Sequence, residues 1–269
     1  GAALALVTYY VAGAAIFFAY LICGRSLVRL SLRGLRLRRA RFVDILRVGG
    51  PSLVNNVQTN LTVVVLTALV GPFGSVALAG YGMGVRLEYL QIPIVFGFGS
   101  ALVTMVGTNV GAGRHERARR VAWTGALMAA AVTGTIGLGA ALFPRAWLGL
   151  FTSEPDVLAA GAAYLRVVGP VYGFFGLGLA LYFASQGAGR LLWPILASAT
   201  RLVVAGVGGW LAVRVAGVEL HGLFVVMAVA LVAFGGIVAG AIRLGAWGSG
   251  DRRRAVIPRV MESSHAHDA

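Results

Sequence analysis

The sequence predicts an all-α fold, a polytopic membrane helix bundle of about seven transmembrane helices, and three observations support this. Of the 269 residues, 58% are hydrophobic and 12% are charged, whereas a soluble domain carries about 25% charged residues. Long apolar runs meet or approach the length of about 20 residues that a helix needs to cross the hydrocarbon core. Short arginine-rich blocks separate many of these runs, as expected of loops that face the cytoplasm.

Seven apolar stretches are predicted to span the membrane. They lie at residues 2–23, 51–70, 78–110, 121–143, 157–184, 191–213 and 220–244. The third stretch is longer than one crossing requires and contains Pro93, which predicts a tilted, bent or broken helix.

The spans divide the chain into four parts. Residues 1–23 form a single transmembrane helix, 24–48 a basic cytoplasmic linker, 49–245 a six-helix bundle, and 246–269 a polar, disordered cytoplasmic tail. Arginines recur at helical spacing in the linker, so it is either a helix on the membrane surface or a solvated connection. Because the sequence opens in an apolar run without Met, we interpret it as a fragment or a processed product.

The charge distribution predicts the orientation. Residues 25–47 contain eight arginines and residues 114–120 contain four, whereas the loops that alternate with these blocks carry few charges. The positive-inside rule therefore places the first residue outside and the last residue in the cytoplasm of a multi-pass cell-membrane protein. The net charge of +14 is explained by these loops, so we expect membrane lipid and no nucleic acid as a partner.

Motifs for enzymes and metal sites are missing from the sequence. There is no lysine for a phosphate-binding P-loop and no G-x-S-x-G motif of a serine hydrolase. His115 and Glu116 begin an H-E-x-x-H zinc motif, but Arg119 stands where the second histidine is required. We expect a protein that is not an enzyme, with no metal site and no covalently bound cofactor.

Ionisable residues inside predicted spans point to a functional site, because each is expensive to insert near the middle of a bilayer. These residues are Arg86, Glu88, Arg166 and Arg201. Glu88 is the one acid among them, so it can exchange a proton, attract a cation or form a structural ion pair. Residues two apart on a helix do not face each other, which favours a partner for Glu88 on another helix over Arg86.

The second span begins with an unusually polar half. Asn55, Thr59 and Thr62 share one face of the predicted helix. Such groups either hydrogen-bond neighbouring helices or line a water-accessible pocket for organic solutes. We take Asn55, Thr59, Arg86, Glu88 and Gln91 as candidates for the lining of a substrate or cation cavity.

Glycine pairs with the spacing small-xxx-small predict close helix packing. They are Gly80 with Gly84, Gly169 with Gly173, and Gly236 with Gly240.

Three segments carry a family resemblance. They are LAGYGMGVRLEYLQIPIVFGFGSALVTMVGTNVGAGRHERARRVAW, the preceding GGPSLVNN, and SQGAGRLLWP at residues 185–194. Together they resemble the carboxy-terminal half of the multidrug and toxic compound extrusion (MATE) family. The pattern G-x-N-x-G-A-G-x-x-x-x-A-R at Gly107 to Arg119 is the most specific part of the match.

The resemblance implies a fold of two six-helix lobes in one chain. Residues 2–23 then correspond to the sixth helix, the following spans to the second lobe, and the first lobe is missing. Some relatives carry an acid in the seventh helix, where Thr59 stands here, and others carry an aspartate in the first helix, which this sequence lacks.

The function implied by the resemblance is cation-coupled antiport. Such a transporter exports small organic, cationic compounds by alternating access, with Na⁺ or H⁺ as the coupling ion. A related alternative is a flippase for lipid-linked or polysaccharide precursors. An alternative of another class is a seven-helix receptor or signalling protein, which the number of spans permits.

Overall fold

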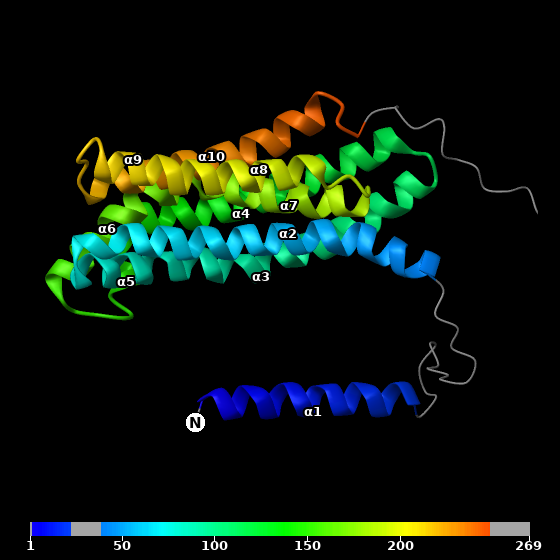
Figure 1. Cartoon of the computed structure of the whole chain (residues 1–269), viewed down its shortest axis with the longest axis horizontal. Helices are drawn as coiled ribbons and strands as arrows, with labels where there is room; N and C mark the ends of the chain where they lie inside the picture. Colours follow the sequence, from blue (N-terminus) through cyan, green and yellow to red (C-terminus); the bar gives the residue numbers. More distant parts are fainter. Residues whose placement is uncertain (1, 23–38, 248–269) are drawn as a thin grey trace, which may run out of the picture. The chain divides into compact units, whose positions relative to one another are not determined.

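The structure is a computed structural model that describes residues 2–22 and 39–247, and every regular element within them is helical (Figure 1). The chain divides into two compact units, Gly1–Leu46 and Arg47–Ala269. The first unit contains helix α1 (Ala2–Ile22). Its aromatic side chains are exposed, for example Tyr9 and Phe17, as expected of an apolar helix whose surroundings are lipid or another part of a larger protein.

The second unit contains six helical segments long and apolar enough to cross a membrane. Four are single helices: α2 (Arg39–Val70, which begins before the unit boundary), α3 (Ser75–Gly111), α4 (His115–Leu142) and α10 (Leu220–Arg243). The other two are composite. One consists of α6 (Pro155–Val168), the 3-10 turn η2 (Gly169–Val171) and α7 (Tyr172–Gly187). The other consists of α8 (Leu192–Val203), the π-helical turn η3 (Val204–Gly208) and α9 (Gly209–Arg214). The short elements η1 (Gly71–Phe73) and α5 (Pro144–Leu148) lie in connections. The predicted multi-pass helical fold is confirmed.

The end of the predicted linker is helical, while the membrane-spanning segment begins at Gly49, where the bundle was predicted to begin. Helix α2 begins at Arg39, so residues 39–48 of the predicted linker are helical and continue without interruption through Pro51. Residues 24–38 lie outside the described residues, so the prediction of a surface helix or a solvated connection there is not tested. The tail from residue 248 also lies outside them.

Of the tilted, bent or broken helix predicted for the span that contains Pro93, the broken form does not occur. Helix α3 runs without a break through Pro93, whereas the predicted fifth span is interrupted at Pro170 by the 3-10 turn η2. Gly169 precedes Pro170 and lies against the backbone of α4, where a Cβ would be 2.6 Å from the carbonyl oxygen of Gly137. Succession of glycine and proline alone does not cause the break, because Gly50 precedes Pro51 where α2 continues. The close contact of Gly169 with α4 distinguishes Pro170 from Pro51.

Close helix packing depends on two of the three predicted glycine pairs. A Cβ at Gly80 would lie 2.7 Å from the backbone nitrogen of Gly161, and one at Gly173 would lie 3.4 Å from the carbonyl oxygen of Ala130. Within residues 2–22 and 39–247 the prediction is wrong for Gly236 and Gly240, since no described atom lies within 4 Å of a Cβ position at either. The spacing alone does not reveal which face of a helix meets a neighbour.

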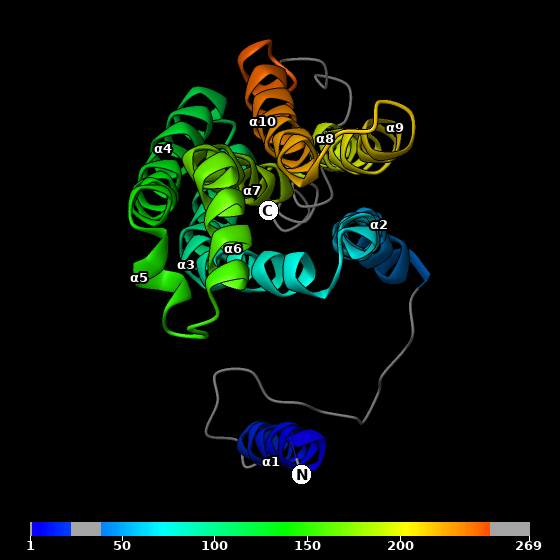
Figure 2. The ribbon, with the colours of Figure 1, turned by 90° about the vertical axis from the view of Figure 1, so that its left-hand side faces the viewer.

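The helices of the second unit pack around α7. Viewed along the helices, α7 lies between α4 on one side and the pair α2 and α8 on the other (Figure 2). The tightly packed core surrounds α6 and α7, with Tyr164, Leu165 and Tyr172 almost fully buried. Helix α2 has few buried side chains, and its polar face is turned towards α7 and α8.

Candidate functional site

A cavity of about 350 Å³ lies between α2, α3, α7, α8 and α10. Its wall combines amides and hydroxyls with aromatic rings and one charged side chain. The lining residues are Ser52, Asn55, Asn56, Thr59, Thr62, Ile92, Phe96, Phe175, Leu179, Tyr182, Phe183, Gln186, Ser198, Arg201 and Phe234. The volume and the mixed lining are typical of a site for a small organic molecule.

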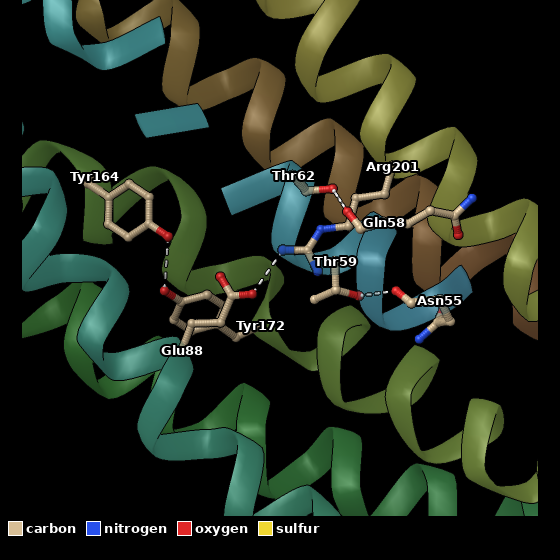
Figure 3. A network of polar contacts seen from close by, with 8 residues as sticks. All are labelled: Asn55, Gln58, Thr59, Thr62, Glu88, Tyr164, Tyr172 and Arg201. Atoms are coloured by element: carbon tan, nitrogen blue, oxygen red, sulfur yellow. Dashed lines mark hydrogen bonds and ion pairs between the residues drawn. The ribbon is translucent and has the colours of Figure 1, made fainter. Parts of the chain in front are cut away.

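Helix α2 contributes the polar side of the cavity. The Thr59 hydroxyl donates to the carbonyl oxygen of Asn55 at 2.9 Å, and the Thr62 hydroxyl donates to that of Gln58 at 2.8 Å (Figure 3). These local bonds satisfy the hydroxyl donors within the helix, as they do for threonines in many membrane helices. The oxygens of both threonines remain at the cavity wall as hydrogen-bond acceptors.

Two side-chain hydrogen bonds connect α2 to its neighbours across the cavity. The Ser198 hydroxyl of α8 donates to Oδ1 of Asn55 at 2.6 Å, and Nε2 of Gln186 in α7 donates to the hydroxyl of Ser52 at 3.3 Å. Asn55 is buried, with 8% of its surface exposed. The polar half of α2 therefore serves both interpretations that the sequence left open: it lines a cavity and it hydrogen-bonds other helices.

A largely buried ion pair lies at one side of the cavity. A guanidinium nitrogen of Arg201 in α8 lies 2.9 Å from a carboxylate oxygen of Glu88 in α3, and both side chains are about 15% exposed. Figure 3 shows the two side chains meeting between their helices. The prediction that Glu88 has its partner on another helix is confirmed, and that partner is Arg201.

The pair is oriented with its cation towards the cavity. Arg201 lines both this cavity and a narrow pocket of about 30 Å³ beside it, whereas Glu88 lines only the narrow pocket, together with Tyr81 and Tyr164. The Arg201 guanidinium also lies 5.8 Å from the ring centre of Phe175 and 6.0 Å from that of Phe234. These contacts hold the guanidinium at the wall.

The five candidate residues do not all reach the cavity. Asn55 and Thr59 line it, and Glu88 reaches it through Arg201. Arg86 is exposed and lies over the ring of Phe151, 5.1 Å from its centre. Gln91 is fully buried and does not line this cavity. A substrate-binding role for any of the five stays a prediction.

Several lining residues were not predicted from the sequence. Gln186 belongs to the Q-G-A-G-R motif but is not in a polar stretch, and Ser198 and the aromatic residues lie in ordinary apolar runs. Arg201 was noticed as an intramembrane charge but was not assigned to the cavity. Its position inside a span was the available signal.

Comparison with known proteins identifies the fold. The chain matches the MatE family over residues 51–211. Among curated relatives, the probable multidrug resistance protein NorM of Thermotoga maritima is 28% identical over 57% of this chain and 33% of that protein. The multidrug export protein MepA of Staphylococcus aureus is 23% identical over 74% of this chain and 45% of that protein. The FAD transporter of Shewanella oneidensis is 24% identical over 62% of this chain and 37% of that protein.

Solved structures show the same architecture. A MOP superfamily transporter from Pyrococcus furiosus superposes with a TM-score of 0.76 at 20% identity, over 86% of this chain and 53% of that one. An outward-facing multidrug resistance MATE transporter superposes with a TM-score of 0.74 at 21% identity, over 86% of this chain and 53% of that one. The chain thus spans between a third and about half of the proteins that it matches. These matches favour a transporter over a receptor, and the chain belongs to the MatE family, whose members are secondary transporters and not enzymes.

Proposed function

We propose that the chain forms one lobe of an antiporter that exports small organic, cationic compounds in exchange for Na⁺ or H⁺ by alternating access. The missing first lobe of the same protein would complete the path. The observation that carries the proposal is the 350 Å³ cavity, with the buried Glu88 and Arg201 pair at its wall. Relatives named for multidrug export and for FAD transport support an organic solute as the substrate.

The ion pair supplies a physical reason for coupling. With Glu88 ionised, the pair has no net charge, and a cationic compound can enter the cavity. When a proton or a sodium ion neutralises Glu88, Arg201 presents an uncompensated positive charge to the cavity. Ion binding and substrate binding then oppose each other, and this is the negative coupling that antiport requires.

The electrostatic repulsion between Arg201 and a cationic compound is large enough to change the affinity of the cavity. Two like charges about 6 Å apart repel by roughly 3 kcal/mol at an effective dielectric constant of about 20. Such a repulsion weakens binding about a hundredfold. The aromatic rings and amides of the cavity wall would provide contacts that do not depend on the charge of Glu88, and therefore a broad substrate range.

The test is dye efflux by the full-length protein in proteoliposomes, with a pH gradient or a sodium gradient imposed separately. Glu88→Gln mimics the neutralised acid, so we expect it to bind a cationic dye such as ethidium at least tenfold more weakly and to lose dependence on the driving ion. The double variant Glu88→Gln with Arg201→Gln removes both charges. It should recover dye binding but not ion dependence.

Glu154→Gln is the matched control, since it neutralises an exposed acid at the start of α6, outside the cavity. It should transport like the unaltered protein. If Glu88→Gln retains normal binding and normal ion dependence, the pair is purely structural and the coupling mechanism fails. If no variant and no unaltered protein moves any organic dye under either gradient, the export function itself fails.

A further inference from the structure

A long open groove runs between α3 and α4, separate from the cavity described above. Its volume is about 810 Å³. Most of its wall is apolar, and three charged residues stand at one end, at the beginning of α4. The lining consists of Ile94, Gly97, Phe98, Ala101, Leu102, Met105, Glu116, Arg117, Arg120, Val121, Thr124, Gly125 and Met128.

Small residues lie along the groove, and Gly97 of α3 leaves open space in its wall. Gly97 and Ala101 of α3 and Gly125 of α4 lie along it, while Met105 and Met128 border it with about half of each side chain exposed. Nothing lies within 4 Å of a Cβ position at Gly97. Flexible methionine side chains suit a surface that adapts to a disordered hydrocarbon chain.

The length of the groove corresponds to one leaflet of a bilayer. The groove, with its charged end, extends from Arg117 to Met128 on α4, eleven residues and therefore about 16 Å of helix. On α3 it covers the same distance, from Ile94 to Met105. Half of the hydrocarbon core is about 15 Å thick, so the groove reaches from the charged interface to about the middle of the membrane.

The charged end of the groove is positive. Arg117 has no ion-pair partner within the described part of the chain. Arg120 lies 3.5 Å from Glu116, but both side chains are about 80% exposed, and such surface pairs contribute little. Trp123 lies beside the guanidinium of Arg243 at the same end of the bundle, 5.1 Å from ring centre to Cζ, as expected at a membrane interface.

We propose that this groove binds an anionic phospholipid. One acyl chain lies between α3 and α4, and the phosphate of the headgroup contacts Arg117 and Arg120. Arginine suits this role because its planar guanidinium can donate two hydrogen bonds to phosphate oxygens. An amphiphile with an acidic head fits this groove, because its apolar wall leads to a basic end and the whole groove is about as long as one leaflet is thick.

Charge variants test the headgroup contact. The protein is placed in nanodiscs of phosphatidylcholine with a minor fraction of phosphatidylglycerol, and retained lipid is measured by native mass spectrometry. Each arginine near a membrane surface contributes about 1 kcal/mol to attraction of anionic lipid, so Arg117→Gln with Arg120→Gln should weaken phosphatidylglycerol retention about thirtyfold. Arg119→Gln is the matched control, because Arg119 is exposed on the same helical turns but does not line the groove.

A second pair of variants tests the acyl-chain contact without touching a charge. Gly97→Leu fills the groove at a position with free space, and it should reduce retention of phosphatidylglycerol at least tenfold. Gly82→Leu is its control, since Gly82 also has nothing within 4 Å of a Cβ position and lies on α3 outside the groove. Thermal unfolding of all variants checks that the fold is retained.

Several results would overturn the proposal. An equal loss of phosphatidylglycerol retention in Arg119→Gln and in Arg117→Gln with Arg120→Gln would mean that the basic loop attracts anionic lipid diffusely, without a defined site. Equal retention of phosphatidylcholine and phosphatidylglycerol would remove the headgroup contact. Unchanged retention in Gly97→Leu would mean that another part of the protein, or a second protein, covers the groove.

Discussion

Gln91 is a polar residue in a buried position of α3. It is fully buried in α3, and neither its amide nitrogen nor its amide oxygen has a hydrogen-bond partner within the described part of the chain. A buried polar group without a partner destabilises a fold by about 1–3 kcal/mol. Groups of this kind persist where they bind water or serve function.

Replacing Gln91 by leucine should therefore stabilise the bundle. Gln91→Leu has nearly the same volume and removes both unpartnered atoms, so we expect about 1–2 kcal/mol of added stability, seen as a higher midpoint of thermal unfolding in detergent. Gln186→Leu is the control, because Gln186 donates to Ser52 and its loss should not stabilise. A lower midpoint for Gln91→Leu would mean that the amide holds a water molecule or an ion.

The misplacement of Gln91 shows how far periodicity alone can position a side chain. Glu88 and Gln91 are three residues apart, a spacing that puts them on neighbouring parts of one helix face. The structure separates them: Ile92 and Phe96 follow Glu88 along the cavity side of α3, while Gln91 and Val95 are fully buried in the core. A boundary between cavity and core can pass between adjacent rows of one helix, and the helices packed against α3 determine where it lies.

Element boundaries were predictable where composition changes sharply. Arginine and glycine clusters separate the apolar runs, and the spans from α3 to α10 end within a few residues of the predicted limits. The interruptions within the spans were less predictable. The π-helical turn at Val204–Gly208 begins three residues after Arg201 in an ordinary run of valine, alanine and glycine, and no residue type signals it. Such turns often occur near functional sites.

Packing between α4 and the α6 to α7 segment gives a prediction about helix contacts. A Cβ at Gly137 would overlap the carbonyl oxygen of Gly169 and lie 2.9 Å from the Cβ of Tyr172, whereas Gly139 has nothing within 4 Å. Gly137→Ala should destabilise the bundle by about 1–3 kcal/mol through overpacking. Gly139→Ala should be neutral or stabilising, because alanine has the higher helix propensity by about 1 kcal/mol.

The measurement is the midpoint of thermal unfolding for the two variants in the same detergent. They lie on one helix, two residues apart, and differ only in what their new methyl group meets. Equal midpoints would indicate that α4 and η2 can separate at little cost, and would remove the glycine contact as a reason for the break at Pro170.

At the scale of the whole molecule, charge is distributed unequally between the two ends of the bundle. At the first end lie the connections from α3 to α4 and from α7 to α8, and the last turn of α10. At the second end lie the connections from α2 to α3, from α4 to α6 and from α9 to α10 (Figure 1). The connections at the first end, with the adjoining turns of α4 and α10, carry six arginines and one acid: Arg114, Glu116, Arg117, Arg119, Arg120, Arg190 and Arg243. The second carries two arginines and three acids: Arg145, Glu154, Asp156, Arg214 and Glu219.

This asymmetry predicts which end faces the cytoplasm. Arginine-rich connections are retained on the cytoplasmic side, so the end with Arg119 should be inside and the end with Ser153, in the loop before α6, should be outside. Cys23 is the one cysteine of this sequence, so Cys23→Ser, with any cysteine outside this sequence also replaced, gives a background in which a single new cysteine can be labelled. In intact cells a membrane-impermeant maleimide should label Ser153→Cys and should label Arg119→Cys only after permeabilisation. Both positions are exposed or partly exposed, so failure to label reports the side of the membrane. The reverse pattern would invert the bundle, place the basic end of the α3 and α4 groove in the outer leaflet, and require the coupling ion to reach Glu88 from the opposite side.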